Sequence, residues 1–205
     1  MLTTVYLVRH AQALPLSHQR EPEWALSPTG SQQAQALVPI LTGLGIQRVY
    51  TSPFRRTRET IAPFCEATGI LAVAHEGLRE RCLSQEWIGD FRDVWRRSWA
   101  DLSFALAGGE SSLECRGRVL AAVEEIVRRH AGETIAVTAH GYTTALFLST
   151  IDPTFGEAQA SALRTPEIVK IVHDGTRFDW HQAFTAGAAF DAIATHFRQT
   201  PGIVA

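Results

Sequence analysis

The chain has 205 residues, 45% of them hydrophobic, which is enough for one sizeable core, and we expect a single domain over residues 1–205. Its formal net charge of −2 creates no overall positive field, which argues against binding to nucleic acid or to an anionic membrane surface. Three widely spaced cysteines fit neither a disulfide framework nor a CxxC metal site.

The beginning of the sequence enters a predicted strand directly, without the basic and apolar regions of a secretory signal. No apolar run is long enough to cross a bilayer. Together with cysteines that suit a reducing compartment, these features lead us to expect a cytoplasmic protein.

Strands and helices alternate in the first part of the predicted chain. The expected elements are a strand over 3–8, a loop over 11–25, a helix over about 28–41, a strand over 48–51, a helix to about residue 67 and a strand over 69–74. Ser27 is the expected N-cap of the first helix, followed by Pro28 at its first position. Ser52 and Pro53 are expected to cap the second helix.

An irregular segment over 76–109 follows and is read as an insertion that covers the site. Within it Phe91, Trp95 and Trp99 recur at every fourth residue and therefore share one helical face. We expect this face to pack on the main core, with a substrate-facing lid as the alternative. Arg92, Arg96 and Arg97 flank the face, and we expect them to be solvated rather than to bind a second anionic group of the substrate.

Further helix and strand signals complete the pattern. They predict a helix over 110–130, a strand over 134–138, a helix from about residue 142, and a hairpin of 167–173 with 176–180 around an Asp-Gly turn. Strands separated by helices indicate an α/β fold. We predict a three-layer sandwich with a mostly parallel central sheet, helices on both faces and a small helical insertion over the site.

Two predicted strands end in a histidine, His10 after the first and His140 after the strand over 134–138. Arg9 precedes the first histidine, and Gly141 follows the second and permits a tight turn into a helix. Open α/β sheets bind their ligands at the carboxyl ends of the strands, so both histidines are candidates for a site there. The alternative is that each ring only satisfies a structural hydrogen bond.

Arginines crowd the first turns of the second predicted helix, at positions 55, 56 and 58. Cations are disfavoured at the positive end of a helix dipole, and an anionic ligand at that end would compensate for them. The alternative is a solvated helix face on which Arg55 pairs with Glu59. We expect both to hold, with Arg55 and Arg58 directed outward and Arg56 inward.

Six motifs in order along the chain resemble those of the histidine phosphatase superfamily, which includes cofactor-dependent phosphoglycerate mutases and many small phosphatases. The matching residues are Arg9-His10-Ala11, the segments 26–34 and 52–60, Leu78-Arg79-Glu80, the segment 108–111, and His140-Gly141. The chain departs from the family pattern with alanine at position 11. It also has no asparagine, although relatives often use one to contact phosphate.

The resemblance implies a mechanism in which His10 takes the phosphoryl group and forms a phosphohistidine. Arg9, Arg56 and His140 would surround the phosphoryl oxygens and stabilise their charge. Glu80 would protonate the leaving oxygen and later deprotonate the attacking water. Because this cationic pocket would replace a metal, no metal or other cofactor is expected.

Two assignments leave alternatives open. Glu86 and Asp90 are alternative acids to Glu80, because the residues after Glu80 run out of register with the family pattern. Glu80 lies between two arginines, which by themselves indicate a surface ion-pair cluster, and its role as an acid requires that both point away from it. Gln12, Ser17 or backbone amides are expected to replace the missing phosphate contacts.

These expectations favour a metal-independent phosphomonoesterase that acts on a small phosphorylated metabolite. A phosphoglycerate mutase is the alternative enzyme, although mutases resembling this chain are usually longer after the Leu-x-Glu region. A catalytically weak protein that binds phosphorylated ligands is the alternative outside the enzymes, and the presence of a candidate nucleophile argues against it.

Overall fold

The computed structural model describes residues 1–196, and its central element is a six-stranded sheet. In their order across the sheet, the strands are β3 (Ala72–Ala74), β2 (Arg48–Thr51), β4 (Thr134–Ala139), β1 (Thr3–Arg9), β6 (Glu167–His173) and β7 (Phe178–Trp180). The first four strands are mutually parallel, and β6 and β7 run antiparallel to their neighbours. The predicted sheet, mostly parallel with one hairpin, is confirmed.

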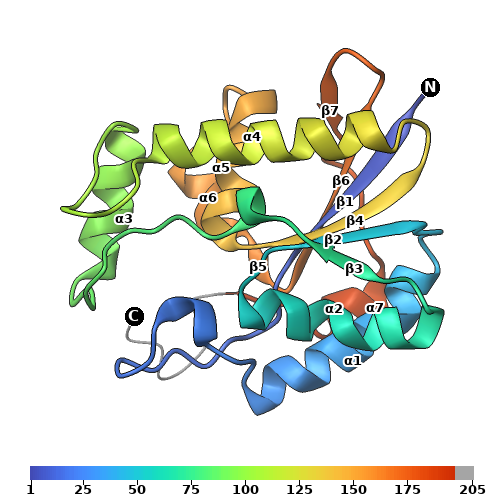
Figure 1. The fold of residues 1–205 in the computed structure, drawn as a ribbon, viewed down its shortest axis with the longest axis horizontal. Coiled ribbons are helices and arrows are strands. Elements are labelled where there is room, and N and C mark those ends of the chain that lie inside the picture. The colour runs from blue at the N-terminus through green and yellow to red at the C-terminus, as the bar shows by residue number, and fades with distance from the viewer. Residues whose placement is uncertain (197–205) are drawn as a thin grey trace.

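Helices cover both faces of this sheet (Figure 1). One face carries α4 (Ser112–Arg129), α5 (Gly141–Ile151) and α6 (Glu157–Ala162). The other carries α1 (Pro28–Thr42), α2 (Arg55–Thr68) and α7 (Ala188–Asp191). The result is the three-layer α/β arrangement that the alternating pattern predicts.

The alternation of side chains along β1 explains why the sheet needs both helical layers. Val5 and Leu7 point to the layer of α4 and α5, where they belong to one buried cluster. Tyr6 and Val8 point to the layer of α1 and α2 and belong to another. Since successive residues of a strand face opposite sides, one apolar run contributes to both cores.

The segment predicted as an insertion contains the short helix η2 (Glu76–Leu78) and α3 (Phe91–Ala100), which lies at one end of the molecule (Figure 1). Phe91, Trp95 and Trp99 pack against a buried cluster that includes Tyr142 of α5. The predicted packing of this aromatic face on the rest of the protein is therefore confirmed. Among the helices of residues 1–196, none has both the length and the apolar character that a bilayer span requires.

The start of α1 agrees with the sequence prediction, and the start of α2 differs from it. Ser27 caps α1 as expected, because its hydroxyl accepts a hydrogen bond from the Gly30 amide at 3.0 Å. The expectation that Ser52 caps α2 is wrong, since the N-cap residue is Phe54. Short elements near the C-terminus were not predicted, namely α6, α7 and the pair β5 (Arg164–Thr165) with β8 (Thr195–His196).

Candidate active site

The pairing of β1 with β4 brings the two candidate histidines together. The strands are parallel and in register, with Arg9 opposite Ala139, so the residue after each strand emerges at the same edge. The His10 amide donates to the Ala139 carbonyl at 3.0 Å, and the rings of His10 and His140 lie 5.3 Å apart between centroids. The carboxyl edge of the sheet therefore carries both rings, as the sequence predicts.

The hydrogen bonds of His10 determine which ring nitrogen is available. Its Nδ1 lies 2.7 Å from the Ala11 carbonyl oxygen, which can only accept, so Nδ1 carries a proton. Burial, together with the charges of Arg56 and Arg9, holds the pKa of His10 well below its usual value. The ring is therefore neutral at pH 7, and Nε2 keeps its lone pair.

Arg56 donates a hydrogen bond to that nitrogen. It lies in the first turn of α2, is 2% exposed, and donates from Nε to His10 Nε2 at 3.2 Å. Arg55 and Arg58 are exposed, and Arg55 pairs with Glu59 at 2.6 Å. The predicted orientations of all three arginines are confirmed.

His140 is positioned by Ser52, which lies just after β2. The hydroxyl of Ser52 lies 2.7 Å from His140 Nε2 and accepts a weaker hydrogen bond from the Phe54 amide at 3.3 Å. Ser52 therefore orients the His140 ring through Nε2 and leaves Nδ1 facing away from this contact.

The Nδ1 atom of His140 is buried and has no hydrogen-bond partner within the described part of the chain. Burial is the main reason that the pKa of His140 lies well below its usual value, and Arg56, His10 and Arg9 add to the effect. The ring is therefore neutral beside His10. A buried ring nitrogen without a partner is costly, and in the tautomer with its proton on Nδ1 the ring would donate to a phosphoryl oxygen.

Arg9 lies against the turn that follows His140. Its guanidinium donates to the carbonyls of Leu163 and Arg164 at 2.8 and 3.2 Å. A Cβ on Gly141 would come within 3.2 Å of the Arg9 guanidinium, which explains why glycine follows this histidine. Burial lowers the pKa of Arg9, partly offset by the charges of Glu80 and Glu167.

Alanine at position 11, where the family pattern has glycine, is accommodated without strain. Among the described residues only glycines have positive φ, so Ala11 adopts ordinary backbone geometry. Its methyl group is fully buried against Leu26 and Ala34, and its amide donates to Thr60 Oγ1 at 2.9 Å. The methyl group therefore packs the nucleophile loop against α1, and the backbone amide joins the loop to α2.

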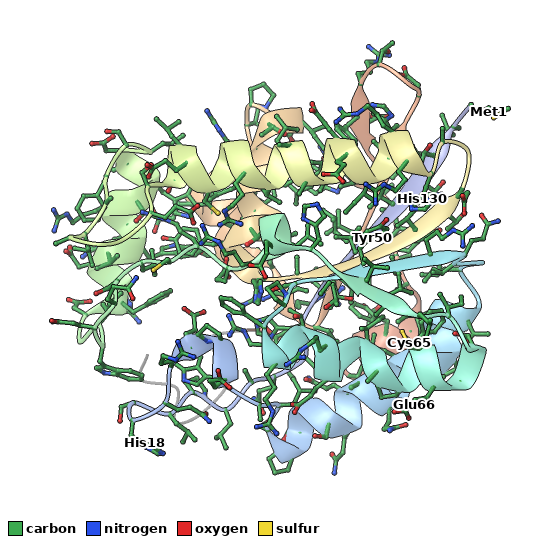
Figure 2. The ribbon with its side chains drawn as sticks, viewed as in Figure 1. Met1, His18, Tyr50, Cys65, Glu66 and His130 are labelled. Atoms are coloured by element: carbon green, nitrogen blue, oxygen red, sulfur yellow. The ribbon has the colours of Figure 1, made fainter. Side chains whose placement is uncertain are left out.

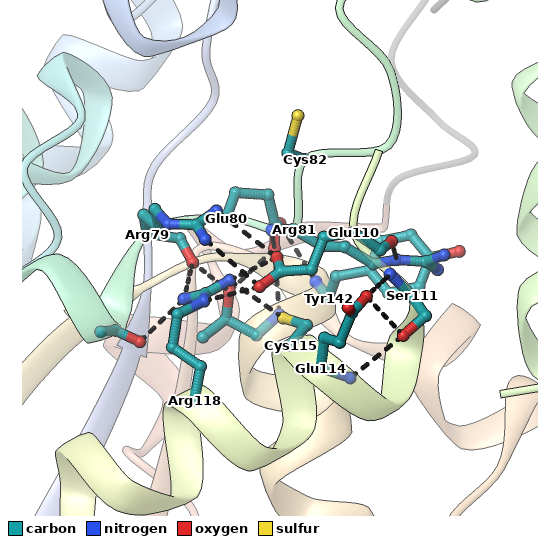
Figure 3. Close-up of polar contacts among 12 residues, drawn as sticks. Arg79, Glu80, Arg81, Cys82, Glu110, Ser111, Glu114, Cys115, Arg118 and Tyr142 are labelled. Carbon is teal, nitrogen blue, oxygen red and sulfur yellow. Dashed lines mark hydrogen bonds and ion pairs between the residues drawn. The ribbon is translucent and has the colours of Figure 1, made fainter. Parts of the chain in front are cut away.

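Glu80 lies at the N-terminus of α5, next to the turn that carries His140. Its carboxylate accepts from the amides of Tyr142 and Thr143 at 3.1 and 3.0 Å and from the Thr143 hydroxyl at 2.8 Å. The amide of Arg81 donates to the same group at 2.9 Å. Figure 3 shows this group beside Tyr142, within the network that joins the 79–81 segment to α4.

The two arginines that flank Glu80 are engaged elsewhere, as its predicted role requires. Arg79 pairs with Glu110 at 3.3 Å, and Arg118 binds the same carboxylate at 2.7 Å (Figure 3). Arg81 is 1% exposed and donates to Phe104 O, Glu110 O and Ser112 Oγ. The alternative of a surface ion-pair cluster is therefore wrong for Arg81, which is buried at the base of the insertion.

Glu21 is the site residue that the sequence analysis missed. It lies in η1 (Glu21–Glu23), and its carboxylate accepts from Arg56 Nη2 at 2.6 Å while its carbonyl accepts from Arg56 Nη1 at 3.0 Å. Burial raises the pKa of Glu21, with a further contribution from Glu80, and Arg56 opposes the shift. The signal in the sequence was the pair Glu21 and Glu23 in the loop after His10, because cations are expected in a loop beside a phosphate site.

The remaining residues named in the sequence analysis are Gln12, the alternative acids Glu86 and Asp90, and the arginines of α3. The Gln12 side-chain oxygen accepts from Ser27 Oγ at 2.6 Å, and its contact with phosphate stays a prediction. Glu86 and Asp90 are exposed, and Asp90 caps α3 through the Asp93 amide. The arginines of α3 at positions 92, 96 and 97 are exposed, and the last two lie 3.7 Å from Asp93, which confirms the predicted solvation.

Two other histidines, His130 and His18, lie at opposite ends of the molecule (Figure 2). His130 lies beside Tyr50, whose hydroxyl is 2.9 Å from its Nε2, towards the end of the sheet where β4 begins. His18 is exposed in the loop over 11–25, at the opposite end of the molecule (Figure 2).

The model of the histidine phosphatase superfamily (branch 1) matches residues 5–184, which span His10, Arg56, Glu80 and His140. The chain belongs to this family. The match covers every motif in the order described above, including the strand ends that bring the two histidines together.

Curated and solved relatives agree with this assignment. The chain is 28% identical to a probable phosphoglycerate mutase of Klebsiella pneumoniae over 72% of its own length and 74% of that protein. It is 27% identical to phosphoserine phosphatase 1 of Hydrogenobacter thermophilus, over 68% and 71% of the two chains. A solved mycobacterial glucosyl-3-phosphoglycerate phosphatase has the same fold, with a TM-score of 0.72, 20% identity, and coverage of 88% and 98%.

Proposed function

We propose that this chain is a metal-independent phosphomonoesterase that acts on a small phosphorylated metabolite through a phosphohistidine at His10. The observation that carries the proposal is the neutral His10 ring, whose proton is fixed on Nδ1 and whose Nε2 lone pair is held by the guanidinium of Arg56. A neutral imidazole nitrogen beside a guanidinium is a nucleophile placed where a phosphoryl group would bind.

In the first step, Nε2 of His10 attacks phosphorus in line with the ester oxygen, and the P–O bond to the alcohol breaks. Glu80 delivers a proton to the leaving oxygen, so the alcohol departs neutral. Arg9, Arg56 and His140 stabilise the equatorial oxygens, and the unpartnered Nδ1 of His140 supports this assignment.

In the second step, Glu80 removes a proton from water, the water oxygen attacks phosphorus, and the bond to His10 Nε2 breaks. The products are inorganic phosphate and a neutral His10. Glu80 lies beside the His140 turn, where it accepts all of its present hydrogen bonds. The first step starts from the protonated form of Glu80, in which the proton is directed at the leaving oxygen in place of one of these contacts, and the second step restores that form.

Hydrolysis of an aryl phosphate in the presence of a chelator tests the proposal. The native chain should be active with and without the chelator, and His10→Ala should lower kcat/KM by about a thousandfold or more, because the nucleophile is lost. His18→Ala is the matched control, since His18 is an exposed histidine of the neighbouring loop, and it should retain native activity.

Activity that persists in His10→Ala would contradict the mechanism. Loss of activity on chelation would contradict metal independence. An inactive native chain that still binds inorganic phosphate would favour the phosphate-binding alternative.

A further inference from the structure

The guanidinium that the proposed mechanism assigns to phosphate already binds a carboxylate from the protein itself. All three nitrogens of Arg56 have partners: Nε donates to His10, and both terminal nitrogens donate to Glu21. These contacts use three of the five N–H groups of Arg56, whose side chain is 3% exposed. A phosphoryl group bound at His10 Nε2 replaces the ring as the partner of Arg56 Nε and shares the guanidinium with the Glu21 carboxylate.

The loop that carries the Glu21 carboxylate is ordered by contacts of Trp24, within the loop and outside it. The indole N–H of Trp24 lies 3.2 Å from the Leu16 carbonyl and 3.1 Å from that of Gln19. The indole ring also contacts Trp87 of the insertion, with 6.3 Å between ring centroids, and faces the Arg56 guanidinium at 5.8 Å. Glu21 therefore lies beside a substrate phosphate that binds Arg56.

Nearby cations are committed to other partners. Arg20 pairs with Glu23 at 3.2 Å, and Arg79 pairs with Glu110 at 3.3 Å. Arg9 donates to backbone carbonyls at the start of β5. Among residues 1–196, a second anionic group on the substrate would therefore meet the negative charge of Glu21 without an uncommitted cation beside it.

We propose that Glu21 is a specificity-determining residue, which selects phosphate monoesters of neutral or cationic alcohols and disfavours those with a second anionic group. This inference rests on the proposed function, because it assumes that substrate phosphate binds Arg56. It narrows the substrate class and argues against an acid-bearing substrate such as a phosphoglycerate.

Two substrates that differ at one carbon test the inference. Glycerol 3-phosphate carries a neutral hydroxymethyl group where 3-phosphoglycerate carries a carboxylate. We expect the native chain to prefer glycerol 3-phosphate by roughly tenfold or more in kcat/KM, since like charges repel in a desolvated site. In Glu21→Gln the preference should shrink to within about threefold, and the inhibition constant of inorganic phosphate should fall by roughly tenfold.

Glu23→Gln is the matched control, because Glu23 lies in the same short helix, is 53% exposed in its side chain and pairs with Arg20 instead of Arg56. It should keep the native preference and the native inhibition by phosphate. An equal change in both variants would overturn the inference, since general surface charge would then explain it. An unchanged preference in Glu21→Gln would overturn it as well.

The same variants separate this inference from the proposed function. Complete loss of both alkyl phosphate activities in Glu21→Gln, with aryl phosphate hydrolysis retained, would make Glu21 the proton donor and overturn its role in selection. If the native chain hydrolyses no phosphate ester, the proposed function fails. Equilibrium binding of inorganic phosphate then tests only whether the charge of Glu21 weakens phosphate binding. Tighter binding to Glu21→Gln than to the native chain and Glu23→Gln would support it, and equal binding would overturn it.

Discussion

Arg56 and Arg81 are both buried almost completely, yet their partners differ in kind. The guanidinium of Arg81 binds two backbone carbonyls and a serine hydroxyl, all within the insertion and the start of α4. Arg56 binds a ring nitrogen of the candidate nucleophile and a glutamate from a surface loop. Arg81 is therefore bound by fixed groups of the fold, whereas Arg56 is bound by groups that can also interact with a ligand.

This difference separates a structural arginine from a functional one. A buried guanidinium with only neutral fixed acceptors ties segments together, and its removal leaves those acceptors without donors. A buried guanidinium such as that of Arg56, whose partners are a carboxylate and a candidate nucleophile, can bind an anionic ligand. Substitution of Arg56 should therefore mainly lower activity, and substitution of Arg81 should mainly lower stability.

The largest expected effect is the loss of activity in Arg56→Gln. We expect kcat/KM for an aryl phosphate to fall by about a thousandfold, because the charge that stabilises the phosphoryl oxygens is removed. Arg55→Gln, in the adjacent exposed residue, should remain within about threefold of native activity, as surface ion pairs contribute little. A comparable loss in both variants would break the distinction drawn for Arg56.

Arg81→Met should act on stability. Because one buried and two partly buried acceptors lose their donors, we expect the free energy of unfolding in urea to fall by about 3 kcal/mol. The kcat/KM of the folded fraction should fall by less than about tenfold, since Arg81 is not assigned to the phosphoryl group. Arg97→Met is the control, as Arg97 lies exposed on α3, and an equal loss of stability there would contradict the account.

The smallest expected effect is the pH dependence of stability that arises from His140. Its pKa is depressed in the folded state by burial and by Arg56, so the unfolded chain binds more protons as the pH falls below about 6.5. Stability is therefore fully present above that pH and decreases below it, by up to about 1.4 kcal/mol per pH unit from this ring. His140→Gln should show a shallower decrease in urea unfolding between about pH 6.5 and 5, and identical slopes would contradict a neutral buried His140.

Much of the fold and part of the site follow from local sequence patterns. The strand before His10 and the strand before His140 are clear apolar runs, and parallel strands place their carboxyl ends at one edge. The inward direction of Arg56 follows from the cost of an arginine at a helix N-terminus. Each of these features depends on a few neighbouring residues, which is why the sequence alone predicts them.

The remaining features depend on contacts between distant segments. Ser52 resembles a helix cap, but its hydroxyl bonds to His140, 88 residues further along the chain. Arg81 resembles a surface charge, and only the path of the insertion shows that its acceptors surround it. Glu21 lies 35 residues from Arg56, so no local pattern links the two. Long-range contacts of this kind leave no periodic signal in the sequence.

Phosphorylation of His10 can be detected by rapid quenching of the native chain during turnover of an aryl phosphate. Peptide mapping by mass spectrometry under alkaline conditions, which preserve phosphohistidine, should find one phosphoryl group on His10, and none there in Arg56→Gln quenched after the same interval. A phosphoryl group on another residue, or turnover of the native chain without any phosphorylated protein, would contradict the account.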